Sequence, residues 1–272
     1  MTKKAFNTVS LLNRVGFFTT FSGTAATSGE KLIRKVPEVT VLFWVIKLLS
    51  TGMGETTSDF LVKEINPIIG VMLGGAGFVA ALVLQLAVRR YIPWVYWLAV
   101  VMVAIFGTMV ADVIHVELGI PYLISTGGFL VALAVIFLTW YRTEKTLSIH
   151  SIYTFRRELF YWATVCATFA LGTAAGDMTA TTLGLGYLDS GILFAVIIAI
   201  PALGYFFFGL NEIIAFWFAY IITRPLGASF ADWMGRATDL GGLGWGTGQV
   251  SLVLAVIIAM LVGYLSVSQK DF

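Results

Sequence analysis

The sequence predicts an all-α membrane protein with eight transmembrane helices, built from four parallel two-helix repeats that are pseudo-symmetric about an axis along the membrane normal. Composition, continuous apolar runs and a repeated motif support this. The 272-residue chain is 58% hydrophobic and only 12% charged, whereas soluble domains are about half apolar and about a quarter charged. Since backbone polar groups must be paired in lipid, and the apolar runs do not alternate with polar residues, we expect helices.

Eight runs approach the length of about 20 apolar residues that a helix needs to cross a bilayer. Proline stands near the start of each of the first four runs, where a helix tolerates it because the first N–H groups have no partner. The expected spans cover residues 38–60, 67–88, 93–115, 121–141, 158–180, 188–208, 212–233 and 249–267. Pro225 is expected to break or kink the seventh span.

Lysine and arginine gather in one set of connections and are sparse in the other. The rich set holds Arg89, Arg90, Arg142, Lys145, Arg156 and Arg157; the poor set holds Lys63 and Arg236. The positive-inside rule therefore predicts that both termini are cytoplasmic. Residues 1–37 form an expected basic cytoplasmic arm without a signal-peptide pattern, residues 38–267 the transmembrane domain, and residues 268–272 a cytoplasmic tail.

A motif recurs four times without gaps, over repeats at approximately 38–90, 91–145, 156–210 and 211–267. An aromatic residue precedes a Trp, a Gly follows ten residues later and an Asp fifteen residues later. The Trp residues are Trp44, Trp97, Trp162 and Trp217; the Gly residues are Gly54, Gly107, Gly172 and Gly227; the Asp residues are Asp59, Asp112, Asp177 and Asp232. Two spans per repeat give all copies one orientation, so the Trp residues share a depth near the cytoplasmic interface. At about 1.5 Å per residue, each Asp lies roughly 22 Å beyond its Trp.

The segment KVPEVTVLFWVIKLLSTGMGETTSDFL, with the later copies FGTMVADVIH, LGTAAGDMTA and PLGASFADW, resembles a family of bacterial membrane proteins defined by four tandem repeats of unknown function. The resemblance covers about residues 36–266. It implies two transmembrane segments and a Trp in each repeat, and we therefore expect a bacterial inner (plasma) membrane location. It carries over no substrate and no catalytic residue.

The four motif Asp residues are the main candidates for a site, because intramembrane carboxylates mostly face the bundle interior and mark ion pathways. Alternatively, each Asp caps a helix start or a break after the Gly and so satisfies free backbone N–H groups. The residue after the motif Gly differs between copies: Glu55, Thr108, Thr173 and Ala228. We expect the four Asp residues and Glu55 to bind a divalent metal ion, with Thr108 and Thr173 assisting. The glycines serve either close helix packing or a broken helix whose carbonyls bind ions.

His115 lies on the same helical face as Asp112 and is a further candidate metal ligand, or else a residue of the outer interface. Lys47 and Arg224 are the intramembrane cations. They either pair with the acids or act as counter-ions or gating groups that a cation displaces. Glu38, Glu158 and Glu212 stand at the starts of three motif spans. There, their negative charges either interact favourably with the helix dipole or serve as a cytoplasmic gate or proton acceptor.

These residues predict a secondary transporter or permease for a cation, most simply a divalent metal ion. A non-transporting sensor or assembly protein with structural Asp caps, and an organic-cation exporter that uses cation–π contacts, are the alternatives. No nucleotide-binding or hydrolase motif occurs, so no enzyme activity is expected. The expected partners are the lipid bilayer and a small cation but no nucleic acid, with a homo-oligomer left open. Apart from a bound divalent ion, no cofactor is expected.

Overall fold

Long helices make up most of the part of the chain that the structure describes. The structure, a computed structural model, describes residues 34–268; most of the expected basic arm (1–37) and the tail residues 269–272 lie outside the described residues. The helices are α3 (Val41–Asp59), α4 (Pro67–Ala87), α5 (Pro93–Asp112), α6 (Tyr122–Glu144), α7 (Phe155–Asp177), α8 (Gly186–Phe208), α9 (Glu212–Gly235) and α10 (Thr247–Ser268). Short π-helical turns follow α3, α5 and α7, at Phe60–Ile65, Val113–Glu117 and Met178–Thr182.

The helix starts follow ordinary capping chemistry. The Thr40 hydroxyl accepts a hydrogen bond from the Phe43 N–H at the start of α3, and Asn66 accepts from two N–H groups at the start of α4. Pro67 and Pro93 occupy the first turns of α4 and α5, as predicted. Pro225 was expected to break or kink the seventh span, and the break does not occur, because α9 continues through Pro225 to Gly235.

Seven helices in residues 34–268, α4 to α10, are long and apolar enough to cross a membrane, which makes this a multi-pass membrane protein. The first long helix, α3, does not belong to this set. Its polar side chains are buried inside the bundle and lower its hydropathy; they are Lys47, Ser50, Thr51, Glu55, Thr56, Ser58 and Asp59.

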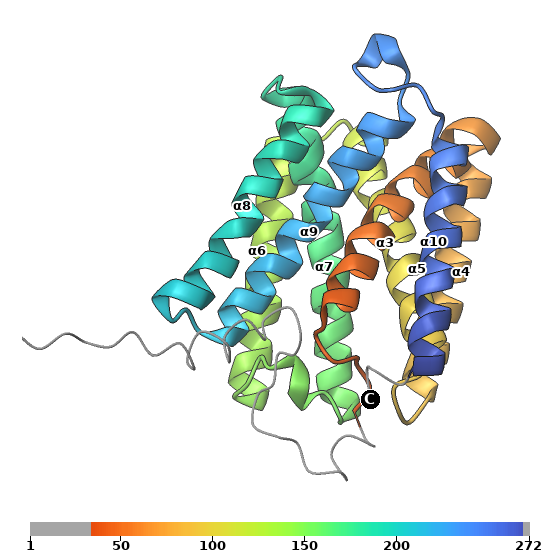
Figure 1. Ribbon diagram of the computed structural model, residues 1–272. Coiled ribbons are helices and arrows are strands. Elements are labelled where there is room, and N and C mark those ends of the chain that lie inside the picture. Colours follow the sequence, from red (N-terminus) through yellow and green to blue (C-terminus); the bar gives the residue numbers. More distant parts are fainter. Residues whose placement is uncertain (1–33, 269–272) are drawn as a thin grey trace, which may run out of the picture.

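The eight long helices form an inner and an outer set (Figure 1). The motif-bearing helices α3, α5, α7 and α9 pack against one another in a closed ring, which we call the inner ring. Outside it, α4 packs on α5, α6 on α7, α8 on α9 and α10 on α3. The second helix of each repeat thus covers the first helix of the next repeat, and the last repeat closes on the first.

The motif glycines allow this close packing. A Cβ added at Gly54 would overlap Ala104 of α5, and one at Gly107 would lie 3.0 Å from the Cβ of Phe169. The same holds for Gly172 against Arg224, and for Gly227 against Thr51. Each contacted residue stands three positions before the motif Gly of the next repeat. The packing alternative for these glycines is therefore supported.

The aromatic pairs close one end of the inner ring, which we call the Trp end; the opposite end is the Asp end. In each repeat the aromatic residue before the motif Trp contacts the Trp of the next repeat, at centroid distances of 5.7–6.2 Å. These pairs are Phe43–Trp97, Tyr96–Trp162, Tyr161–Trp217 and Phe216–Trp44. We call this set the aromatic layer.

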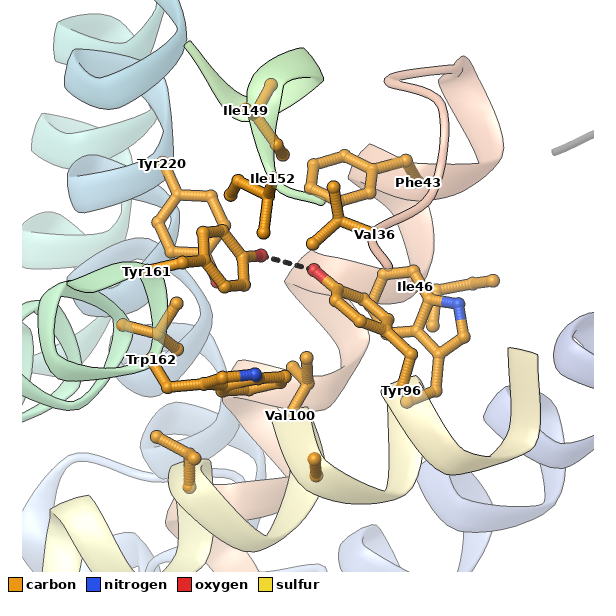
Figure 2. Close-up of a cluster of buried hydrophobic side chains, with 14 of the residues drawn as sticks. Val36, Phe43, Ile46, Tyr96, Val100, Ile149, Ile152, Tyr161, Trp162 and Tyr220 are labelled. Carbon is orange, nitrogen blue, oxygen red and sulfur yellow. Dashed lines mark hydrogen bonds between the residues drawn. The ribbon is translucent and has the colours of Figure 1, made fainter. Parts of the chain in front are cut away.

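The aromatic layer is capped from outside the helices. Figure 2 shows Tyr96 and Tyr161 joined by a hydrogen bond between their hydroxyl groups, with Val36, Ile149 and Ile152 above them. Val36 belongs to the segment before α3, and the two isoleucines to the connection between α6 and α7. Trp97, Trp162 and Trp217 are buried, so they pack the protein interior and do not anchor it to the lipid interface.

Candidate functional site

A buried ion pair lies in the middle of the inner ring. The Arg224 side chain is 0% exposed, and its Nη2 donates to Glu55 Oε2 over 2.8 Å. The same Nη2 donates to the Thr173 hydroxyl over 2.7 Å and to the Thr108 hydroxyl. Arg224 Nη1 reaches the Thr51 carbonyl at 3.4 Å. The predicted pairing of Arg224 with an acid is therefore confirmed.

The positions that follow the motif Gly meet at this ion pair. Glu55, Thr108 and Thr173 come from α3, α5 and α7, and all three touch one guanidinium nitrogen. The fourth copy has Ala228 there, and α9 contributes Arg224 from one turn earlier. The departures from the repeat thus form a single polar cluster.

Carboxylates converge toward the Asp end. One carboxylate oxygen from each of Glu55, Asp177 and Asp232 lies within 4.8 Å of the others. The Asp112 carboxylate interacts electrostatically with Glu55, Asp59 and Asp232. The first, third and fourth repeats therefore bring an acid to one point, as expected of ligands for a single cation.

Two basic side chains pair with Asp59, and one of them also pairs with Asp232. Arg236, in the connection after α9, contacts Asp232 Oδ1 at 2.9 Å and Asp59 Oδ2 at 3.1 Å. Lys63 contacts Asp59 Oδ1 at 2.7 Å but is half exposed. Burial would lower the pKa of Arg236, but the Asp232 and Asp59 carboxylates raise it above its usual value, so the guanidinium stays charged.

The capping alternative for the motif Asp residues finds no support in the geometry. Asp59, Asp112 and Asp177 are each the last residue before a π-helical turn, yet none of their side chains makes a capping hydrogen bond. Asp232 lies inside α9, three residues before its end. The regular spacing therefore places carboxylates at the Asp end of the ring and does not serve to satisfy free backbone N–H groups.

His115 lies outside the converging group. Its Nδ1 is 2.6 Å from the Ile120 carbonyl oxygen, and its ring stacks on Tyr122. The described groups that could hold a metal ion do not include it. The structure thus gives His115 a place in the connection between α5 and α6.

Lys47 is 1% exposed, and no acid pairs with it in the described part of the chain. Its Nζ lies 4.1 Å from the centre of the Phe169 ring and 4.3 Å from that of Tyr220. It also lacks a hydrogen-bond partner. Of the two predicted intramembrane cations, only Arg224 is neutralised by a carboxylate.

An open cavity of 560 Å³ lies at the Asp end, lined by Asp59, Lys63, Glu64 and Arg236 together with the connection between α9 and α10. The Trp end is closed by the aromatic layer. Of the motif carboxylates, Asp59 lines this opening, and Arg236, which pairs with Asp59 and Asp232, lines it as well.

Acidic side chains at the Trp end also have partners. Glu158 is buried in the first turn of α7, where it pairs with Lys35 and accepts from Gln85 Nε2 over 3.0 Å. Glu38 precedes α3 and pairs with Arg34, so it is not a first-turn residue. The sequence did not indicate Lys35, Gln85 and Arg236 as partners of these acids. Lys35 and Gln85 lie 123 and 73 residues before Glu158 along the chain. Arg236 lies outside the expected span that contains Asp232.

Comparison with known proteins identifies the repeat itself. The family model described as "Repeat of Unknown Function (DUF347)" matches four times, at residues 42–91, 95–146, 160–210 and 215–271. No curated protein and no solved structure matches the chain. Because the four matches cover most of the sequence, the chain belongs to the family defined by this repeat of unknown function.

Proposed function

We propose that the protein is a secondary transporter or permease for a cation, with a divalent metal ion as the substrate. The observation that carries the proposal is the convergence of Glu55, Asp177 and Asp232 to within 4.8 Å of one another. Carboxylate ligands without sulfur or imidazole suit Mg²⁺, Ca²⁺ and Mn²⁺. Like charges this close repel one another, and a bound cation relieves that repulsion.

The balance of charge supports a cation over an anion. Five carboxylates gather around the buried ion pair and the Asp end: Glu55, Asp59, Asp112, Asp177 and Asp232. The described cations that face them are Arg224, Arg236 and the half-exposed Lys63. The acids therefore outnumber the bases, which favours a positively charged substrate.

We further propose how the helices cross the membrane and which end of the inner ring faces the cytoplasm. All eight long helices span it, α3 included, because α3 lies beside α5, α9 and α10 and turns its polar side chains inward. The four repeats are pseudo-symmetric about the inner ring's axis, as the cyclic glycine and aromatic contacts suggest. With the arginine-rich connections cytoplasmic, the Trp end faces the cytoplasm of a bacterial cell, and the open cavity faces outward.

Binding of a divalent ion tests the proposal directly. We expect Mg²⁺, Ca²⁺ or Mn²⁺ to raise the thermal stability of the purified protein, by about 2.7 kcal/mol at a hundredfold excess over the dissociation constant. Asp177→Asn should weaken binding at least about tenfold, or about 1.4 kcal/mol. Asp177 is well suited, because no ion pair of its side chain occurs in the described structure and the Glu55–Arg224 pair stays intact.

The matched control is Asp239→Asn, which alters an exposed Asp in the connection between α9 and α10. It should bind the ion like the wild type. If no divalent ion stabilises the wild-type protein, or if both variants respond alike, the carboxylates are not a cation site.

A non-transporting membrane protein is the second candidate, and the ion pairs of Arg236 favour it. Arg236 links Asp59 of α3 to Asp232 of α9 and so fastens the first repeat to the last. If this is the acids' sole function, Asp59→Asn should lower stability while the wild type responds to no ion. The stability measurements above separate the two candidates.

A further inference from the structure

Lys47 breaks the repeat at a position where the other copies carry no base. Three residues after the motif Trp stand Lys47, Val100, Val165 and Tyr220. All four side chains are buried. A buried ammonium lowers the stability of the fold unless an acid neutralises its charge. An ionisable residue inside a membrane is by default a functional candidate.

The partners of Lys47 are ring faces. Its Nζ lies over Phe169 of α7 and Tyr220 of α9, at 4.1 and 4.3 Å. Cation–π contacts with desolvated rings stabilise an ammonium, but less than a buried carboxylate does. Lys47 can therefore hold a proton here, but any positive charge that comes closer favours its release.

Arg224 is the charged group placed to do this. Lys47, Thr51 and Glu55 lie four residues apart, on one face of α3. Arg224 reaches this face between the two charged residues, with Nη1 at the Thr51 carbonyl and Nη2 at Glu55. Its Cζ lies 5.4 Å from the centre of the Phe169 ring that also carries Lys47. One guanidinium therefore touches the cation site on one side and the environment of Lys47 on the other.

We propose that Lys47 is the proton carrier of a cation–proton antiport, with Arg224 transmitting the exchange. The ammonium of Lys47 keeps Arg224 on Glu55. A cation that binds Glu55, Asp177 and Asp232 displaces the guanidinium toward Phe169, and the nearby positive charge drives the proton from Lys47 Nζ to water on the side then open. The reverse step reloads Lys47 as the cation leaves. Proton and cation thus exclude each other without sharing a ligand.

Few other titratable groups face Lys47. From α9 they are Arg224, which acts on it electrostatically, and the Tyr220 phenol. From α7 the facing side chain is Phe169, which does not titrate. The phenols of Tyr96 and Tyr161 belong to the aromatic layer, one helical turn nearer the Trp end, where they are hydrogen-bonded to each other. Lys47 is therefore the basic group on this path that can lose a proton.

This inference rests on the proposed function, and its test separates the two. Mn²⁺ is added to the full-length purified protein in weak buffer. Binding is followed by the loss of the free-ion electron paramagnetic resonance signal, and proton release by a pH indicator. The wild type should release up to one proton more per bound ion than Lys47→Met, and Lys47→Met, which has no ammonium to oppose the ion, should bind Mn²⁺ at least as tightly as the wild type. Lys47→Arg, which keeps a permanent charge, should bind Mn²⁺ at least about tenfold more weakly.

The same variants are then compared in proteoliposomes. A pH gradient should drive Mn²⁺ accumulation by the wild type at least about tenfold above that by Lys47→Met, which should only equilibrate the ion. Equal proton release and equal pH-driven accumulation by the wild type and Lys47→Met would overturn the role of Lys47 and leave the cation site standing. If the wild type does not bind Mn²⁺ at all, the proposed function fails and this inference fails with it. Thermal unfolding of each variant shows that it is folded.

Discussion

Replacement of Arg224 by methionine is expected to destabilise the folded protein by about 3–5 kcal/mol, because it leaves the Glu55 carboxylate buried without its partner. The guanidinium also donates to the hydroxyl groups of Thr108 and Thr173. The variant therefore removes hydrogen bonds from α9 to α3, α5 and α7 at once. Methionine keeps most of the aliphatic stem that packs against Gly172. Denaturant or thermal unfolding in detergent measures the loss.

Two further variants identify the cause of this loss. The double variant Arg224→Met with Glu55→Gln should be more stable than the sum of the single effects predicts, because it removes both charges; the coupling should be about 1–3 kcal/mol. Arg156→Met breaks an exposed ion pair with Glu144 and should change stability by no more than about 0.5 kcal/mol. Equal losses in Arg224→Met and Arg156→Met would show that the buried pair does not hold the ring together.

Gly54→Ala should separate the inner helices and cost about 1–3 kcal/mol, as overpacked cores do. The added Cβ would overlap the Ala104 Cβ and lie 2.8 Å from the Ala104 carbonyl carbon, which is backbone and cannot turn aside. The cost outweighs the gain of about 1 kcal/mol that alanine brings to a helix over glycine. Thermal unfolding of the variant against the wild type measures the net effect.

Gly128→Ala is the matched control, since Gly128 also lies within a long helix, α6, but has nothing within 4 Å of an added Cβ. It should leave stability unchanged or raise it. The packing account of the motif glycines is wrong if Gly54→Ala behaves like Gly128→Ala.

The sequence predicted the helices well and located the acids that the structure brings together, because both follow from local patterns. The bounds of α5 and α8 agree with the expected spans to within a few residues, since long apolar runs leave a helix few alternatives. The gap-free repeat located Asp177 and Asp232, which the structure brings together with Glu55. Glu55, Thr108 and Thr173 were singled out as departures from the repeat, and the structure gathers them around Arg224.

What the sequence could not predict depends on which helix faces which. That Arg224 bonds to Glu55, 169 residues away, follows from the closing of α9 onto α3. Arg236 resembled an ordinary loop residue, and only the proximity of Asp59 and Asp232 reveals it as a partner. His115 shares a helical face with Asp112, but the π-helical turn after Asp112 changes the direction of the side chains that follow. Pro225 was expected to break or kink a helix that the structure shows to be continuous.

The most direct test of the central claim is uptake of Mn²⁺ into proteoliposomes that contain the full chain. We predict that the wild type accumulates more Mn²⁺ than empty liposomes do. Asp177→Asn should reduce this accumulation at least about tenfold, a factor worth about 1.4 kcal/mol, and Asp239→Asn should retain it. Uptake by the folded wild type that equals that of empty liposomes for Mn²⁺, and likewise for Mg²⁺ and Ca²⁺, would contradict it, and the converging carboxylates would then have a structural function alone.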